Sequence, residues 1–174
     1  SGITCAGRNQ IRGGLFTAFG SPSAFSITLT YSGTATETVG AIASWSGAST
    51  SIDDISKANT NGDGGACTGG TDNSTTSLSI TTSVDQETIV SCMGTRSQSI
   101  STPDPAYTQR ASAISACVLI RFLMFDLIGA AIATDNCSHT LVSNQDWFTS
   151  GFGVLQGAAA SAVIPLRSLL GVGT

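Results

Sequence analysis

The chain has 174 residues, enough for one domain with its own hydrophobic core. Only 10% of them are charged, where about a quarter is usual, and the net charge at pH 7 is -4. The seven basic residues are scattered, which excludes nucleic acid as an expected partner. Ser, Thr, Gly and Ala are abundant, a composition typical of secreted and cell-surface β proteins.

The first part of the chain predicts short strands separated by turns. Residues 15–19 are largely apolar and end at a Gly-Ser-Pro turn, which indicates a first strand. Residues 26–31 alternate hydroxyl and apolar side chains, the period of a half-buried strand. Residues 39–45 also alternate, and their small side chains favour a central strand packed closely on both faces. Residues 53–76 are rich in Asp, Asn and Gly and predict a loop.

Three further strands are predicted at residues 78–80, 87–94 and 107–113. Between the last two, residues 97–106 are polar. Pro103 and Pro105 exclude a central strand there, because proline cannot donate to a sheet ladder.

The most apolar run of the chain, residues 117–133, contains Arg121 and Asp126. Each would cost roughly 2.5–3.5 kcal/mol at the centre of a membrane helix, so no membrane span is predicted. A buried helix is the alternative, and we favour a strand because the neighbouring segments are strands. Alternation would then divide its side chains between two faces, with Ile120, Phe122 and Met124 on one and Leu119, Leu123 and Phe125 on the other.

Residues 138–143 and 147–156 predict the last strands before the C-terminal tail. Many short strands broken by Gly, Ser and Pro loops indicate an all-β fold. We therefore predict a single antiparallel β-sandwich, of the jelly-roll or immunoglobulin-like kind, over residues 1–156. Residues 157–174 are treated as a separate apolar strand or tail.

The tail, GAAASAVIPLRSLLGVGT, contains a single charge, at Arg167. It is too apolar for a free terminus and too short to span a bilayer. It either folds back as the last strand of its own sandwich or fills a groove on a neighbouring subunit. Pro165 should interrupt its ladder and divide it into two short pairing segments. In the second case, the residues expected at the subunit interface are Val163, Ile164, Leu166, Leu169 and Leu170.

Three segments resemble secreted and phage-associated prokaryotic β-sandwich surface domains. In residues 26–49, SITLTYSGTATETVGAIASWSGAS, a Ser/Thr-rich strand leads through SGTAT to an apolar strand and a WSG corner. Residues 74–94 are similar to the strand pair that follows it, and residues 138–156 to the closing SxDW-type strand. The resemblance spans roughly residues 11–156 and implies a surface, adhesive or structural domain, with no catalytic motif to carry over.

One departure from that pattern suggests how copies would assemble. The resembled domains open with one or two further strands, whereas only the polar residues 1–10 precede the first strand here. A missing strand together with a spare apolar tail resembles subunits of pili and extracellular threads that assemble by strand donation. A head-to-tail contact that does not close gives an open filament.

We therefore expect a structural subunit of an extracellular filament whose partners are copies of itself, and not an enzyme. The alternative is a non-catalytic glycan- or surface-binding module of a phage or cell-surface adhesin. Its sugar platform would use the aromatic residues Trp45, Trp147, Tyr31 and Tyr107, although both tryptophans lie in apolar alternation that favours a core position.

The five cysteines fit two disulfides and one spare thiol, with the pairing left open. The candidates are Cys5, Cys67, Cys92 and Cys137, and the alternative is that all the thiols are reduced. Because the chain starts at Ser1 without a leader, it looks like a mature secreted protein, extracellular or on the cell surface, although a recombinant start would look the same.

The remaining motifs point only weakly to chemistry. His139 is the only histidine, and no G-x-S-x-G elbow accompanies it, so we expect a structural imidazole at a strand edge. Asn59, Asn61 and Asp63 match the opening of a calcium loop. Gly70 stands where that loop needs a closing Glu, so an ordinary turn is favoured and no cofactor is expected.

Asn73 and Asn136 each begin an N-x-S/T sequence, the acceptor for N-linked glycan. Asn73 lies in a polar segment. At Asn136 the middle residue is Cys137, whose bonding would restrict the site. Attached sugar is therefore an expected partner, with a role in protection and solubility.

Overall fold

The computed structural model describes part of the chain, namely residues 2–3, 13–20, 26, 28, 30, 34, 37–60, 73–96, 102–115, 120–157 and 164–173, the first and last of these ranges by their backbone. The regular secondary structure in these ranges consists of β-strands alone, and all paired strands are antiparallel. In chain order the strands are β1 (Gly2–Ile3), β2 (Gly13–Gly14), β3 (Thr38–Ser46), β4 (Ala48–Asn59), β5 (Asn73–Thr81), β6 (Glu87–Thr95), β7 (Thr108–Ile114), β8 (Arg121–Ala130), β9 (Thr134–Gln145), β10 (Trp147–Gln156) and β11 (Ile164–Gly173).

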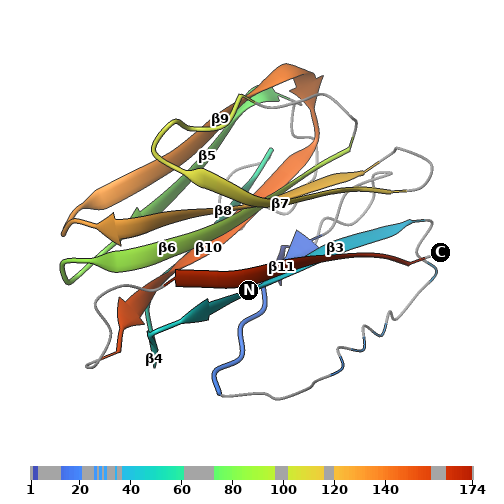
Figure 1. The fold of residues 1–174 in the computed structure, drawn as a ribbon. Helices are drawn as coiled ribbons and strands as arrows, with labels where there is room; N and C mark the ends of the chain where they lie inside the picture. Colours follow the sequence, from blue (N-terminus) through green and yellow to red (C-terminus); the bar gives the residue numbers. More distant parts are fainter. Residues whose placement is uncertain are drawn as a thin grey trace.

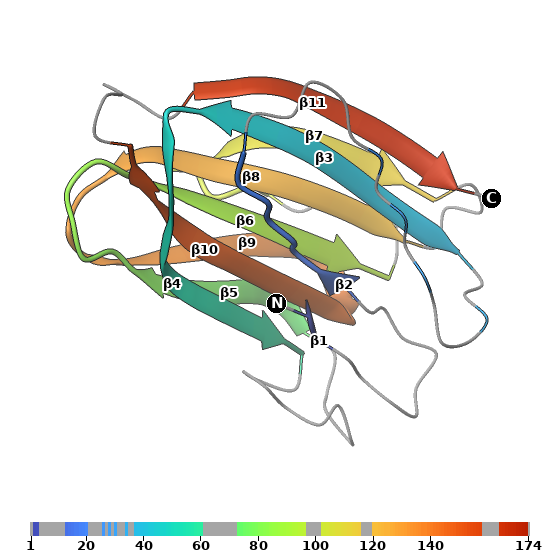
Figure 2. The same cartoon turned by 90° about the horizontal axis from the view of Figure 1, so that it is seen from below.

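The centre of the molecule is a five-stranded sheet with the order β4-β10-β6-β8-β7. One of its faces is covered by the pair β5-β9 and the other by the pair β11-β3 (Figures 1 and 2). The arrangement confirms the predicted all-β antiparallel class and is consistent with a β-sandwich. In the described ranges there is no helix long and apolar enough to cross a membrane.

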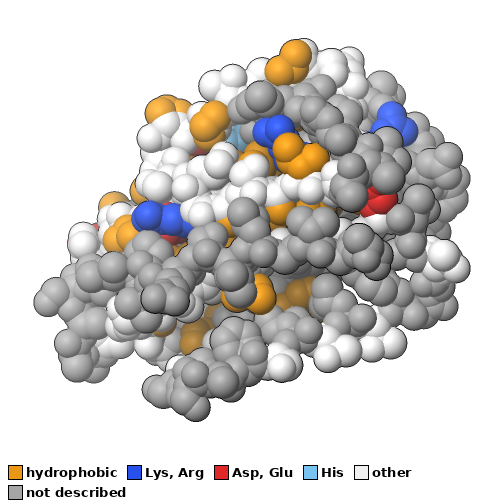
Figure 3. Space-filling view, turned by 45° about the vertical axis from the view of Figure 1, so that its right-hand side comes forward, with side chains coloured by type: hydrophobic (Ala, Val, Ile, Leu, Met, Phe, Trp, Pro, Cys, Tyr) orange, Lys and Arg blue, Asp and Glu red, His pale blue; other side chains and the backbone are white. Residues whose placement is uncertain are grey.

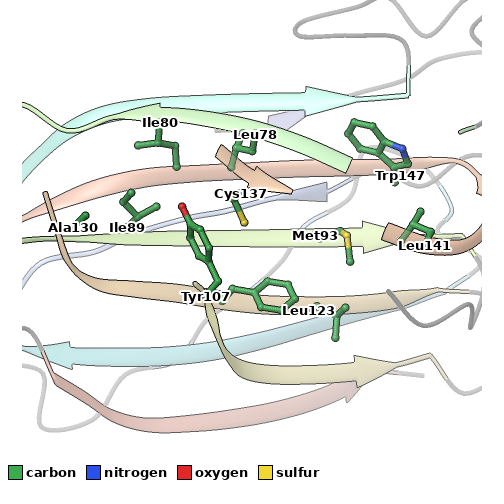
Figure 4. Packing of buried hydrophobic residues seen from close by; sticks show 11 residues of the cluster. Leu78, Ile80, Ile89, Met93, Tyr107, Leu123, Ala130, Cys137, Leu141 and Trp147 are labelled. Carbon is green, nitrogen blue, oxygen red and sulfur yellow. The ribbon is translucent and has the colours of Figure 1, made fainter. Parts of the chain in front are cut away.

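Burial of the central sheet on both faces gives the protein two hydrophobic clusters. Side chains alternate between the two faces along β6. Val90 and Cys92 lie in the cluster under β3, whereas Ile89 and Met93 lie in the cluster under β5 and β9. Figure 4 shows the second cluster, where side chains of β5, β6, β8 and β9 meet Trp147 of β10. Strand β6 is buried along its whole length because both of its faces are covered, one by each cluster.

The apolar run at residues 117–133 contains strand β8, as predicted, and not a helix. Its side chains divide between the two faces as expected, Phe122 and Met124 toward β3, Leu123 and Phe125 toward β5 and β9. The strand predicted at residues 147–156 is confirmed without change as β10. Those predicted at 78–80, 87–94, 107–113 and 138–143 are confirmed as β5, β6, β7 and β9, with shifted or longer bounds.

Other predictions for the first part of the chain were wrong. Residues 15–19 belong to no strand, although Leu15 reaches the core. Of the strand predicted at 26–31, the described residues Ser26, Thr28 and Thr30 are exposed and outside any strand, and the others lie outside the description. The strand predicted at 39–45 exists as β3, but it pairs in an outer two-stranded sheet and is not central. Its small residues reflect close packing on the core and not a central position.

The loop predicted for residues 53–76 was also wrong at both ends, because β4 continues to Asn59 and β5 begins at Asn73. The aspartates that suggested a loop lie in a strand. Asp53 accepts hydrogen bonds from the backbone and hydroxyl of Ser83, and Asp54 accepts one from the backbone of Thr81. Their oxygens accept hydrogen bonds from the end of β5 and from the turn after it, partners that sequence spacing alone does not reveal.

The surface has few charges, in keeping with the composition. Figure 3 shows charged side chains as small separate patches among uncharged ones on the face it presents. The exposed large hydrophobic residues, such as Phe16, Ile55 and Val142, come from different elements of the chain. Single exposed hydrophobic residues of this kind are ordinary and mark no binding surface.

Candidate functional site

The C-terminal tail forms a strand that pairs with β3 of its own chain. The antiparallel ladder runs from Ile164 opposite Ser46 to Gly173 opposite Thr38 (Figure 2). Its register shifts between Pro165 and Arg167, as an interruption at the proline predicts, but the tail forms one strand and is not divided into two short segments. Of the residues predicted at a subunit interface, Ile164, Leu166, Leu169 and Leu170 lie on β11, and Val163 is outside the described residues.

The tail leaves the central sheet at the corner where β3 turns into β4. Gly47 forms this corner with a φ of 78°, a left-handed conformation that favours glycine. Its carbonyl accepts a hydrogen bond of 2.7 Å from the backbone N–H of Gly157, directly after β10. Because β11 starts its ladder opposite Ser46, both ends of the connection from β10 to β11 lie at this corner.

Strand β3 is fixed to the β7–β8 hairpin by side-chain hydrogen bonds near both of its ends. Before the strand, Glu37 accepts a hydrogen bond from the hydroxyl of Ser115, directly after β7. Near its other end, Nε1 of Trp45 donates to Oδ2 of Asp126 on β8, at 3.0 Å. The position of β3 is therefore set by contacts that do not include β11.

Asp126 is the polar centre of this attachment. Its side chain is completely buried, and Nε of Arg110 on β7 lies 2.8 Å from both carboxylate oxygens. A buried carboxylate requires such a partner, because its transfer from water is otherwise very unfavourable. Asp126 stands out in the sequence as a charge within an apolar run, but nothing there identifies Arg110 and Trp45 as its partners.

His139 is a core residue and not the strand-edge imidazole that we expected. It is 1% exposed, and its ring stacks on Phe125 with centroids 4.3 Å apart. Nδ1 accepts a hydrogen bond from the backbone N–H of Asp104, so the ring proton lies on Nε2, 3.2 Å from the sulfur of Cys137. Burial raises the pKa of Cys137 to about 12, so this Cys–His pair holds a shielded thiol and not a reactive thiolate.

His139 should make the protein sensitive to mild acid. Burial lowers its pKa, so its contribution to stability is complete above the unfolded-state value near 6.5 and is lost as the pH falls through that value. We expect the difference in free energy of unfolding between the wild type and His139→Gln to shrink from pH 7.5 to pH 5. Urea denaturation of both proteins at the two pH values measures this. An unchanged difference would contradict the assignment.

The disulfides predicted for Cys92 and Cys137 are absent, and both residues are buried free thiols. The physical reason is that they belong to different clusters on opposite faces of the central sheet, so they cannot reach each other. The other two candidates, Cys5 and Cys67, are outside the described residues.

The weak calcium motif begins on a buried residue. Asn59 is 2% exposed and ends β4, where it pairs with Phe148, and it does not lie in a loop. Asn61 and Asp63 are outside the described residues. In the described part of the chain, no three His, Cys, Asp or Glu side chains gather in a way that could hold a metal ion.

Both predicted glycan acceptors are exposed, and both are anchored through the amide oxygen. Oδ1 of Asn73 accepts a hydrogen bond of 2.7 Å from Nε1 of Trp147, and Oδ1 of Asn136 accepts one of 2.6 Å from the hydroxyl of Ser79. A glycan would be attached to the amide nitrogen, which these bonds do not use. Glycosylation at either position stays a prediction.

Comparison with known proteins does not place the chain in a family. No protein-family model, no curated protein and no solved structure matches it. The function must therefore be argued from the geometry of the chain itself.

Proposed function

We propose that the protein is a secreted, non-enzymatic structural subunit that polymerises into an extracellular filament by exchanging its C-terminal strand. The observation that carries the proposal is that β11 pairs only with β3 among the described strands. The same antiparallel ladder forms equally well when β11 comes from another copy of the chain. Exchange that passes from copy to copy without closing builds an open filament.

The edge that would accept the donated strand is held in place without β11. Glu37 and Trp45 attach β3 to the β7–β8 hairpin through Ser115 and Asp126. When β11 leaves, the N–H and C=O groups of β3 lose their partners along a whole strand. Such an exposed edge readily pairs with another strand, which favours capture of a neighbour's tail.

No specific observation favours the alternative of a sugar-binding module. Trp147 and Tyr107 are 5% and 7% exposed, so their rings are not available as a platform. Trp45 is half-buried, and its indole N–H is used by Asp126. Tyr31, the fourth aromatic residue of the hypothesis, lies outside the described residues.

Deletion of residues 158–174 tests the proposal and keeps Gly157 with its bond to Gly47. We expect the full chain to form filaments and the truncated chain to remain monomeric, because it can neither donate a strand nor extend a polymer. Size-exclusion chromatography and negative-stain electron microscopy measure both outcomes.

A synthetic peptide of residues 158–174 provides the complementary experiment. It should bind the truncated chain and stop polymerisation of the full chain, since it occupies the β3 edge without offering a new one. A peptide with Leu169→Asp and Leu170→Asp is the matched control and should do neither. Filaments formed by the truncated chain would show that strand exchange is not the mechanism.

A further inference from the structure

Two carboxyl groups meet at the edge of the central sheet, away from β11. Glu87 begins β6 and is completely buried, and its carboxyl group lies by the Asp53 carboxyl and the backbone of Ser83 and Val84. Asp53 lies on β4, where its two oxygens accept hydrogen bonds of 2.6 Å and 2.8 Å from the backbone and hydroxyl of Ser83.

The strand between them, β10, makes room for both groups. Gly153 lies where the register of β10 against β4 shifts, between Phe152 and Val154. A Cβ atom on Gly153 would lie 2.8 Å from Oε2 of Glu87 and 3.5 Å from Cβ of Asp53. The two carboxyl groups therefore share the space above a bare stretch of backbone.

The groups around the pair supply no compensating positive charge. On β4, Asp54 is directed to the backbone N–H groups of Ile55 and Thr81, and in the turn before β6, Asp85 is exposed. Glu87 has Gly153 of β10 and Ala130 of β8 as neighbours, and neither of these residues carries a charge. Within the described ranges, no Lys, Arg or His forms an ion pair with either carboxyl group.

We propose that Asp53 and Glu87 share one proton and act as a pH-sensitive latch that holds the edge strand β4 to the centre of the sheet. The protonated Glu87 carboxyl donates a hydrogen bond to the Asp53 carboxylate, which gives the buried O–H group a charged acceptor. Loss of this proton leaves two neighbouring anions, one of them buried.

The direction of the pH dependence follows from this arrangement. Burial, and then the neighbouring Asp53, raise the pKa of Glu87 to about 7, while the Ser83 hydroxyl lowers the pKa of Asp53. Because the folded-state pKa of Glu87 lies above its unfolded value of 4.5, the latch stabilises fully below that value. Its contribution is lost as the pH rises through about 7.

The test compares the thermal midpoints of wild type and Glu87→Gln from pH 5 to pH 9. The amide donates to Asp53 at every pH, so the variant should lack the fall in midpoint that the wild type shows around pH 7 and should exceed the wild type at pH 8.5. Asp85→Asn is the matched control, an exposed carboxylate of the same turn, and should follow the wild type. Parallel curves for the wild type and Glu87→Gln would overturn the proposal.

Two further measurements keep the proposal open to refutation if Glu87→Gln folds poorly. Carbon-13 NMR of the wild type should show the Glu87 carboxyl titrating near pH 7, and titration at the ordinary value near 4.5 would contradict the latch. Calcium chloride at pH 8.5 should not raise the wild-type midpoint. If it does so, and only while Glu87 is present, the pair holds a cation and not a proton.

Discussion

The variant Arg110→Met is expected to lower the free energy of unfolding by about 3–5 kcal/mol, the usual effect of leaving one member of a buried ion pair alone. The guanidinium neutralises Asp126, whose side chain has no contact with water. Without it, the carboxylate keeps only the hydrogen bond from Trp45, which carries no charge. Urea denaturation monitored by tryptophan fluorescence measures the loss.

The matched control is Arg96→Met, which should cost clearly less than Arg110→Met because Arg96 is half exposed and its contact with Asp146 is 3.6 Å long. Combining Arg110→Met with Asp126→Leu should recover much of the lost stability, since no buried charge then remains. If the single and double variants were equally unstable, the loss would come from packing and not from the unpaired charge.

The variant Gly151→Val is expected to lower the free energy of unfolding by about 3 kcal/mol, at the upper end of the usual range for overpacking. A Cβ atom at this position of β10 would lie 2.8 Å from the backbone oxygen of Val90 and 2.9 Å from Cδ2 of Leu78. The side chain of Leu78 can move, but the Val90 oxygen belongs to the backbone of β6, so β10 would have to shift against its neighbour in the sheet. Denaturation in urea gives the value directly.

Gly40 on β3 offers the matched control, because a Cβ atom there meets nothing within 4 Å. Gly40→Ala should therefore leave stability unchanged or raise it slightly, as expected for a glycine in the interior of a strand. Equal losses at the two positions would show that backbone flexibility matters more than close approach between the sheets.

The local pattern of the sequence predicted strands well wherever both faces of a strand are buried. Residues 147–156 were predicted without error, and the alternation in the apolar run of β8 assigned Phe122 and Phe125 to the correct opposite faces. These strands are easily recognised in the sequence because burial on both faces makes most of their positions apolar or small. Prediction failed where polar residues lie in strands, as at Asp53 and Asp54. Their hydrogen-bond donors, Ser83 and Thr81, are distant in the sequence.

The candidate site was predicted only in part. The apolar tail and the interruption at Pro165 are visible in the sequence, because they depend on composition and on a missing N–H group. The strand that receives the tail was not predictable, since strand pairing is a contact between distant segments. The same holds for the attachment of β3 through Trp45 and Asp126, and for the separation of Cys92 and Cys137 into different layers, which rules out a disulfide between these two.

The sequence by itself therefore determined the all-β class, four of the five strands of the central sheet (β6, β7, β8 and β10) and the strand-forming character of the tail, all of which follow from local periodicity and polarity. Only the tertiary structure decided which strand occupies which layer, that β11 lies on β3, and that Glu87 meets Asp53 above Gly153. The physical reason is that periodicity specifies which face of a strand is buried, whereas the partner on that face is selected by packing of the whole chain.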